Sequence, residues 1–139
     1  MIHVTLERFL KAQESDYSIA LSEIKNGRKR SHWMWYIFPQ YKGLGFSSTA
    51  QYYAIQSKKE AEDYLEHLVL GERLLEISEA LLEIERNDAS RVLGYPDDMK
   101  LKSSMTLFYL VSRNEIFKKV LDKFFDGKID EKTKNLLYS

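Results

Sequence analysis

Residues 72–86 read ERLLEISEALLEIER. Leu74, Ile77 and Leu81 recur at intervals of three and four residues, and Ile84 continues the same row. Such a row lies on one face of an α-helix, and the acidic residues between its members fall on the opposite face. These acids are Glu72, Glu76, Glu79 and Glu83. The segment is the clearest amphipathic helix in the chain, and it indicates a fold built by packing helices together.

The same spacing recurs along most of the chain, so we expect one all-α, or very predominantly α, domain spanning residues 1–139. A short first helix is expected over Leu6–Gln13. Ser15, Ser57 and Asn114 are then the predicted N-caps of later helices. Residues 105–111 are apolar on every helical face, which predicts the central core helix. Helix ends or bends are expected at glycines, namely Gly27, Gly71, Gly94 and Gly127.

Two segments leave the choice between helix and strand open. Residues 32–38 are aromatic and apolar without polar alternation, so they are expected to be buried on more than one side. Pro39 ends this segment in either conformation. Residues 49–55 form a second short element of undecided type, and residues 41–48 between the two are expected to be a loop.

Composition narrows the class of protein. The chain has 139 residues, of which 44% are hydrophobic, enough for one buried core. It contains no cysteine, which excludes disulfides, thiol catalysis and zinc sites built on thiolates. The formal net charge is zero, so there is no strong nucleic-acid signal. Neither a signal peptide nor a membrane span is expected, and we predict a cytoplasmic protein of undetermined oligomeric state.

Residues 27–45 hold the densest group of functional residue types. The segment opens with Arg28, Lys29 and Arg30, whose charges suit either a phosphate ligand or the end of the preceding helix. His32 follows, and it is a candidate acid–base catalyst or a structural histidine. His32 has no second histidine at metal-ligand spacing, so we expect no metal site.

The second half of this segment is aromatic and glycine-rich. Trp33 and Trp35 are either core residues or rings that stack on the base or sugar of a ligand. Gln40, Gly43 and Gly45 are candidates for a loop that approaches a ligand closely. Because Gly43 and Gly45 lack the third glycine and the strand–helix context of a dinucleotide-binding fingerprint, we expect no cofactor.

A second polar segment spans residues 97–106, directly before the apolar core helix. Lys100 shares a helical face with two serines, and either Lys100 or Lys102 could act as a nucleophile or a general base. The alternative interpretation is an ordinary helix start with surface lysines. The further candidate ligand-binding residues are Asp97, Asp98, Ser103 and Ser104.

Residues 27–40, GRKRSHWMWYIFPQ, resemble the signature of domain-of-unknown-function family 1810. The resemblance continues in LERF at 6–9, GLG at 43–45, LGERL at 70–74 and DDMKLKSSMTLF at 97–108, so it covers nearly the whole chain. It implies a compact α-helical domain without an established activity, and some members carry the label calpastatin. A weaker similarity, in residue types only, is to the NADAR group, which is linked to ADP-ribose and other N-glycosides.

Two functions follow as hypotheses. In the first, the two polar segments meet around one pocket that binds or hydrolyses a small phosphorylated, nucleotide-like N-glycoside of the ADP-ribose type. Arg28 and Arg30 would hold phosphate, a tryptophan would stack, and His32 with Lys100 or Lys102 would supply the chemistry. In the second, residues 28–40 form a non-catalytic module that docks a protein or a nucleic-acid end. The sequence leaves open whether the protein is an enzyme.

Overall fold

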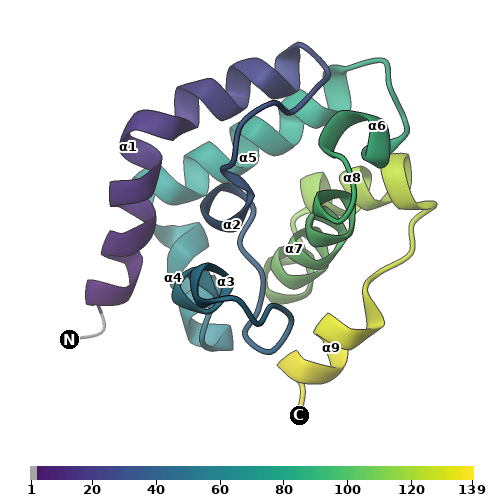
Figure 1. Ribbon diagram of the computed structural model, residues 1–139. Helices are drawn as coiled ribbons and strands as arrows, with labels where there is room; N and C mark the ends of the chain where they lie inside the picture. The colour runs from purple at the N-terminus through teal and green to yellow at the C-terminus, as the bar shows by residue number, and fades with distance from the viewer. Residues whose placement is uncertain (1–2) are drawn as a thin grey trace.

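The computed structural model describes residues 3–139, and within this range every regular element is a helix (Figure 1). The prediction of an all-α domain is therefore confirmed. In chain order the helices are α1 (His3–Lys25), α2 (Met34–Ile37), α3 (Ser48–Tyr53), α4 (Lys58–Glu66), α5 (Leu68–Glu83), α6 (Ala89–Leu93), α7 (Asp97–Ser112), α8 (Glu115–Phe125) and α9 (Glu131–Leu137).

Helices α1 and α5 run side by side in the same direction (Figure 1). Midway along the pair, the Tyr17 hydroxyl donates to the backbone carbonyl of Arg73 at 3.0 Å, and Arg73 Nη1 donates to Gln13 Oε1 at 3.3 Å. At their C-terminal ends, Gly27 lies next to the side chain of Arg86. These contacts fix the direction in which the loop after α1 leaves the pair.

The core lies between α5 and the α7–α8 hairpin, with α4 closing one side. Phe108 of α7 is fully buried, as are Tyr64 and Phe117. The Phe108 ring lies 5.3 Å from the ring of Tyr64 and 6.0 Å from that of Phe117, centroid to centroid. Residues 105–108 of the predicted core helix are fully buried, whereas residues 109–111 are half-buried at the edge of the core.

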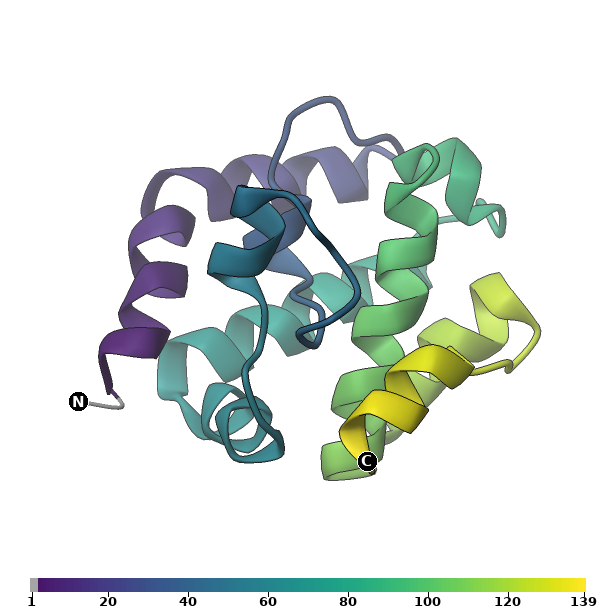
Figure 2. The same ribbon diagram turned by 60° about the horizontal axis from the view of Figure 1, so that its bottom comes forward.

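Of the remaining short helices, α3 and α9 lie in front of the core helices in Figure 2. The loop after α2 is joined to the chain after α3 by two backbone bonds, Ile55 N to Gln40 O at 2.8 Å and Lys42 N to Ile55 O at 2.9 Å. Helix α9 is attached to α7 through Asp130, whose backbone N–H donates to Thr106 Oγ1 at 2.8 Å. The loop before α3 also meets α9, because Gly43 lies against the side chain of Leu136.

Two predicted helix boundaries are wrong. The break predicted before Ser15 is absent, because α1 continues to Lys25. The break predicted at Gly71 lies instead at His67, whose Nδ1 accepts from the N–H groups of Val69 and Leu70 and so begins α5. Gly71 serves a different purpose: a Cβ there would lie 2.1 Å from the Leu65 carbonyl oxygen, so only glycine allows α4 to approach α5 this closely.

Both undecided segments are helical. The first contains the single-turn helix α2 and the second contains α3, which Ser47 caps by accepting from the N–H of Ala50. Across residues 3–139, extended pairing is limited to one isolated parallel bridge between Tyr41 and Ile55. In the same range, no helix is long and apolar enough to cross a membrane.

Candidate functional site

Glu23, on the last turns of α1, holds the loop that leads into the candidate site. Its Oε1 accepts from the backbone N–H groups of Arg30 (2.8 Å) and Ser31 (3.0 Å) and from Trp33 Nε1 (2.9 Å). Its Oε2 accepts from the Ser31 hydroxyl at 2.6 Å. Burial alone would raise the pKa of Glu23, but these four hydrogen bonds favour the charged form and lower the pKa to about 2. No sequence pattern singles out this residue.

The loop then turns Lys29 inward and Trp33 into the core. Trp33 is 1% exposed, and the Lys29 Nζ lies 5.2 Å from the centroid of its ring. The same ammonium lies 3.0 Å from Asp97 Oδ2, at the start of α7. The backbone N–H of Lys29 donates to Val92 O at 2.7 Å, so both ends of this residue are fixed. Lys29 therefore joins the first polar segment to the second.

Asp97 is shared by two lysines. Its second oxygen, Oδ1, lies 3.5 Å from the Nζ of Lys100, one turn further along α7. The Lys100 ammonium in turn lies 5.2 Å from the ring centroid of Trp35. One carboxylate thus stands between two lysines, each against a tryptophan ring. Because two positive charges face one negative charge, the group has an excess of one positive charge available to an anion.

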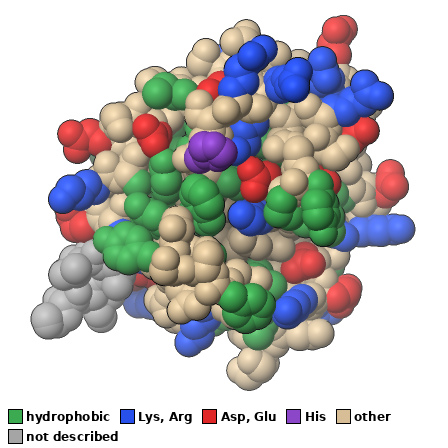
Figure 3. Space-filling view, in the orientation of Figure 1, with side chains coloured by type: hydrophobic (Ala, Val, Ile, Leu, Met, Phe, Trp, Pro, Cys, Tyr) green, Lys and Arg blue, Asp and Glu red, His purple; other side chains and the backbone are tan. Residues whose placement is uncertain are grey.

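A cavity of about 410 Å³ opens beside Lys100. It lies between α2, the loop before α3, the first turns of α7 and the start of α9. Figure 3 shows this face, where cationic and acidic side chains lie between groups of hydrophobic ones. We call it the Trp35–Lys100 cavity. Its lining residues are Trp35, Gln40, Leu44, Gly45, Phe46, Ser47, Ala50, Pro96, Met99, Lys100, Ser103, Asp130 and Lys132.

Comparison with known proteins identifies the family. Residues 3–137 match the family described as "Protein of unknown function (DUF1810)". The chain belongs to this family. The fold is similar to that in the crystal structure of a conserved hypothetical protein from Mycobacterium tuberculosis. The two chains share 42% sequence identity and superpose with a TM-score of 0.94, and the match covers 96% of each chain. No curated protein matches the sequence.

The family assignment confirms the resemblance seen in the signature of residues 27–40 and extends over almost the whole chain. It does not support the calpastatin label or the similarity to the NADAR group. Neither the DUF1810 description nor the structural neighbour supplies a ligand or a reaction.

The structure of this DUF1810 chain brings part of the two predicted segments together. From the first segment the cavity is lined by Trp35, Gln40 and Gly45, and from the second by Lys100 and Ser103. Lys29 and Asp97 adjoin Lys100 through the ion pairs described above.

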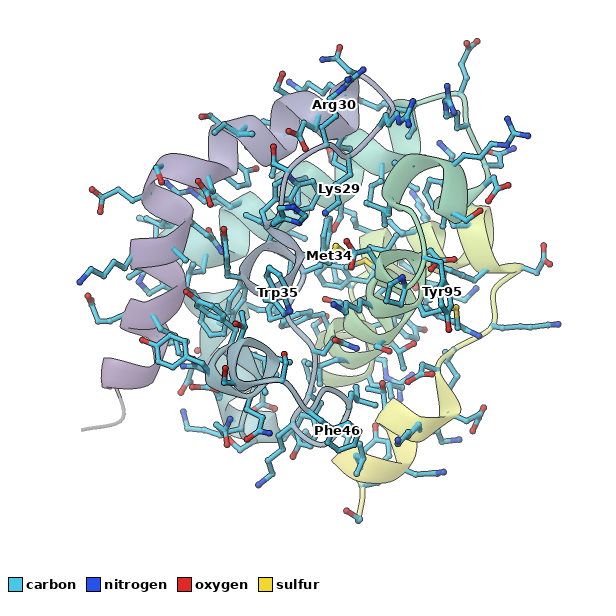
Figure 4. The ribbon with its side chains drawn as sticks, in the orientation of Figure 1. Lys29, Arg30, Met34, Trp35, Phe46 and Tyr95 are labelled. Carbon is cyan, nitrogen blue, oxygen red and sulfur yellow. The ribbon has the colours of Figure 1, made fainter. Side chains whose placement is uncertain are left out.

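The basic start of the first segment lies elsewhere. Arg28, Arg30 and His32 are exposed, and none of them lines the cavity. Figure 4 shows Arg30 near the C-terminal end of α1, whereas Trp35 lies near the middle of this face and Phe46 beyond it. The physical reason is that Glu23 binds the loop through its backbone N–H groups, an arrangement that we call the Glu23 clamp. It leaves the side chains of Arg28 and Arg30 in solvent.

The other predicted residues have local roles or different surroundings. The Asp98 carboxylate accepts from the Met99 N–H at 2.9 Å, and Lys102 is partly buried away from the cavity. Gly43 lines a neighbouring cavity. The Ser104 hydroxyl is buried and has no hydrogen-bond partner within the described part of the chain. The same part contains no group of three or more His, Asp or Glu side chains placed to hold a metal ion.

The α9 side of the cavity was not predicted as part of the site. Asp130 Oδ2 accepts from the Ser103 hydroxyl at 3.2 Å and from the Thr133 N–H at 3.0 Å, and it also accepts from the Thr133 hydroxyl. These bonds fix the N-terminus of α9 beside α7 and bring Lys132 to the cavity wall. The sequence signal was limited to an aspartate at a helix start, which is common at any N-cap.

Proposed function

We propose that the Trp35–Lys100 cavity binds the sugar-phosphate part of a small nucleotide-like N-glycoside of the ADP-ribose class. The observation that carries this proposal is the position of Lys100, which lines the cavity. Among the described residues its one ion-pair partner is Asp97, and it shares this carboxylate with Lys29. An ammonium with a shared counter-ion retains both charge and donor capacity for a phosphate. Lys132 adds a second cation on the opposite, α9 side of the cavity.

The rest of the lining supports a sugar. The Trp35 indole provides an aromatic wall, and aromatic faces suit sugars and bases alike. Gln40 supplies an amide for hydrogen bonds to a polyol, and the Ser103 hydroxyl, which donates to Asp130, can still accept one. The cavity volume of about 410 Å³ lies within the range typical of small-molecule sites, roughly 300–1,000 Å³.

Binding is better supported than hydrolysis of the N-glycosidic bond. Glycosidic cleavage usually requires carboxyl groups that act as acid, base or nucleophile. Asp130 is the one carboxylate among the cavity's described lining residues, and its hydrogen bonds to Ser103 and Thr133 already hold α9 in place. Lys100 would then have to supply the chemistry, so hydrolysis is the first reaction to assay once a ligand is found.

The second candidate is the docking module of residues 28–40. The exposure of Arg28, Arg30 and His32 favours an anionic partner at this end of the molecule. The aromatic half of the segment argues against docking through the whole stretch, because Trp33 is 1% exposed and Phe38 is equally buried. A partner would meet the cations without Trp33 or Phe38.

The test is isothermal titration calorimetry with ribose 5-phosphate and with ADP-ribose. We expect saturable binding of both, lost in Lys100→Ala and retained in Lys119→Ala, which removes an exposed lysine of α8. At a ligand concentration of one hundred times Kd, the bound protein should gain about 2.7 kcal/mol of stability in a thermal-shift assay. The double variant Arg28→Ala/Arg30→Ala should bind normally. Binding that depends on these arginines and not on Lys100 would favour the docking module instead.

A further inference from the structure

A second cavity, of about 450 Å³, lies next to the first. The two share Gly45 and Phe46, so the segment containing these residues forms the boundary between them. We call the second one the Gln51–Gln56 cavity. Its lining residues are Lys42, Gly43, Gly45, Phe46, Gln51, Ala54, Gln56 and Leu136.

Two glutamine side chains in this cavity have fixed orientations. Gln51 Nε2 donates to the backbone carbonyl of Phe46 at 2.7 Å, and Gln56 Nε2 donates to that of Ala54 at 2.9 Å. Since a carbonyl oxygen can only accept, each amide must present its nitrogen to the backbone. The oxygen of each amide is then left to accept from another group. The cavity therefore offers two side-chain acceptors that suit a ligand with N–H donors.

Phe46 and Leu136 provide apolar surface beside these acceptors. Phe46 contributes an aromatic ring that is 75% exposed, and Leu136 of α9 lies opposite Gly43, 3.4 Å from where a Cβ would stand. Exposing a large ring to water is unfavourable, because burying apolar surface lowers the free energy. A flat ligand that covered Phe46 would recover this free energy.

The boundary segment is also held in place. The backbone bonds between Gln40, Lys42 and Ile55 join the start of this loop to the chain that carries Gln56. A Cβ on Gly45 would lie 2.6 Å from the Cβ of Ala50, so only glycine fits this close approach to α3. The two cavities are thus kept at a constant separation, which a ligand spanning both would require.

We propose that the Gln51–Gln56 cavity binds the base of the same ligand, and that this base carries an amino group, as adenine and guanine do. Gln51 Oε1 and Gln56 Oε1 accept from the N–H groups of the base, and Phe46 covers one side of its ring. The sugar phosphate occupies the Trp35–Lys100 cavity, and the N-glycosidic bond crosses the Gly45–Phe46 boundary. The position of the base rests on the proposed function, whereas the acceptor character of the second cavity does not.

The test compares four probes by calorimetry on the full chain: ribose 5-phosphate, adenosine 5′-monophosphate, purine riboside 5′-monophosphate and adenosine. The third differs from the second only by lacking the amino group. We expect adenosine 5′-monophosphate to bind at least tenfold more tightly than either ribose 5-phosphate or the purine riboside. In the double variant Gln51→Met/Gln56→Met, its affinity should fall to that of ribose 5-phosphate, whose own affinity should not change.

Unchanged binding of ribose 5-phosphate also shows that the double variant is folded. Equal affinities for ribose 5-phosphate and adenosine 5′-monophosphate, both lost in Lys100→Ala, would overturn the base site and leave the proposed function standing. The base site would also be overturned if adenosine 5′-monophosphate kept its tenfold higher affinity in the double variant. The same holds if purine riboside 5′-monophosphate bound as tightly as adenosine 5′-monophosphate. If neither phosphate binds, the proposed function fails. Adenosine binding that requires Gln51 and Gln56 would then support the base site alone, and no adenosine binding would overturn it.

Discussion

The substitution Glu23→Gln tests how strongly the clamp on the loop after α1 stabilises the fold. Glutamine keeps the shape of the side chain and can still accept from Arg30, Ser31 and Trp33, but it removes the charge. The pKa of Glu23 falls from 4.5 to about 2 in the folded protein, because the hydrogen bonds outweigh the effect of burial. This difference corresponds to about 3 kcal/mol of stabilisation of the charged form. Since the side chain is partly exposed and solvent screens its charge, we expect about 2 kcal/mol.

The sign of the pH dependence follows from the lowered pKa. A carboxylate whose folded pKa lies below the unfolded value stabilises the protein fully above the unfolded pKa, here 4.5, and loses that contribution as pH falls toward about 2. Urea unfolding of wild type and Glu23→Gln should therefore differ by about 2 kcal/mol at pH 7 and should converge between pH 4.5 and the acid limit.

Glu14→Gln, an exposed acid on the same helix, is the matched control and should stay close to wild type throughout. Glu23→Ala should destabilise the protein more than Glu23→Gln, since it leaves several donors without an acceptor. Each such donor, when buried, lowers the stability by about 1–3 kcal/mol. A difference between wild type and Glu23→Gln below 0.5 kcal/mol at pH 7, on the order of an ordinary surface change, would refute the clamp. A difference that does not vary with pH would refute its electrostatic origin.

Three further substitutions test the scaffold by urea or thermal unfolding. Phe108→Ala should destabilise by about 3–5 kcal/mol, because it empties a fully buried ring site, and a loss under 1 kcal/mol would contradict its central position. Gly71→Ala should destabilise by about 1–3 kcal/mol, because its Cβ would meet the Leu65 carbonyl oxygen at 2.1 Å, and a neutral result would mean that α4 can shift away freely. Lys123→Met should cost about 1.5–3 kcal/mol, since its ammonium donates to the carbonyls of Leu81, Leu82 and Ile84 at the end of α5, and wild-type stability would show that water replaces it.

The helices were predictable wherever one apolar row continued without a change of phase. The prediction failed at Ser15, which was taken for an N-cap because serine caps helices often. In the structure the Ser15 hydroxyl donates to Asp16 Oδ1 at 3.1 Å, and no helix begins there. One face of α1 is buried on both sides of Ser15 in the chain, at Phe9, Gln13, Ala20 and Ile24. The helix therefore continues past Ser15, which lies on its exposed face. Tertiary burial of the buried face outweighs the local preference of one serine.

The sequence could not distinguish helix from strand at residues 32–38 and 49–55, because both segments are too short to show a hydrophobic periodicity. Their surroundings decide it. Met34 and Ile37 of α2 are 2% exposed, so the single turn buries its apolar side chains against neighbouring helices. The isolated bridge between Tyr41 and Ile55 joins the segment that follows α2 to the segment that follows α3. Within residues 3–139 it does not extend into a sheet.

For the candidate site, residue type alone could not separate the cations that hold the fold from those that face a cavity. The six Lys and Arg residues of the two polar segments are chemically similar, and their roles differ by depth. Lys29, with 9% of its side chain exposed, is enclosed by Trp33 and Asp97, whereas Lys100, at 25%, reaches the cavity. Arg28 and Arg30 extend into solvent because their loop is bound through its backbone. Asp97 accounts for this difference. It lies closer to the deeper lysine, at 3.0 Å against 3.5 Å, and so leaves Lys100 the less neutralised of the two, as the proposed phosphate site requires.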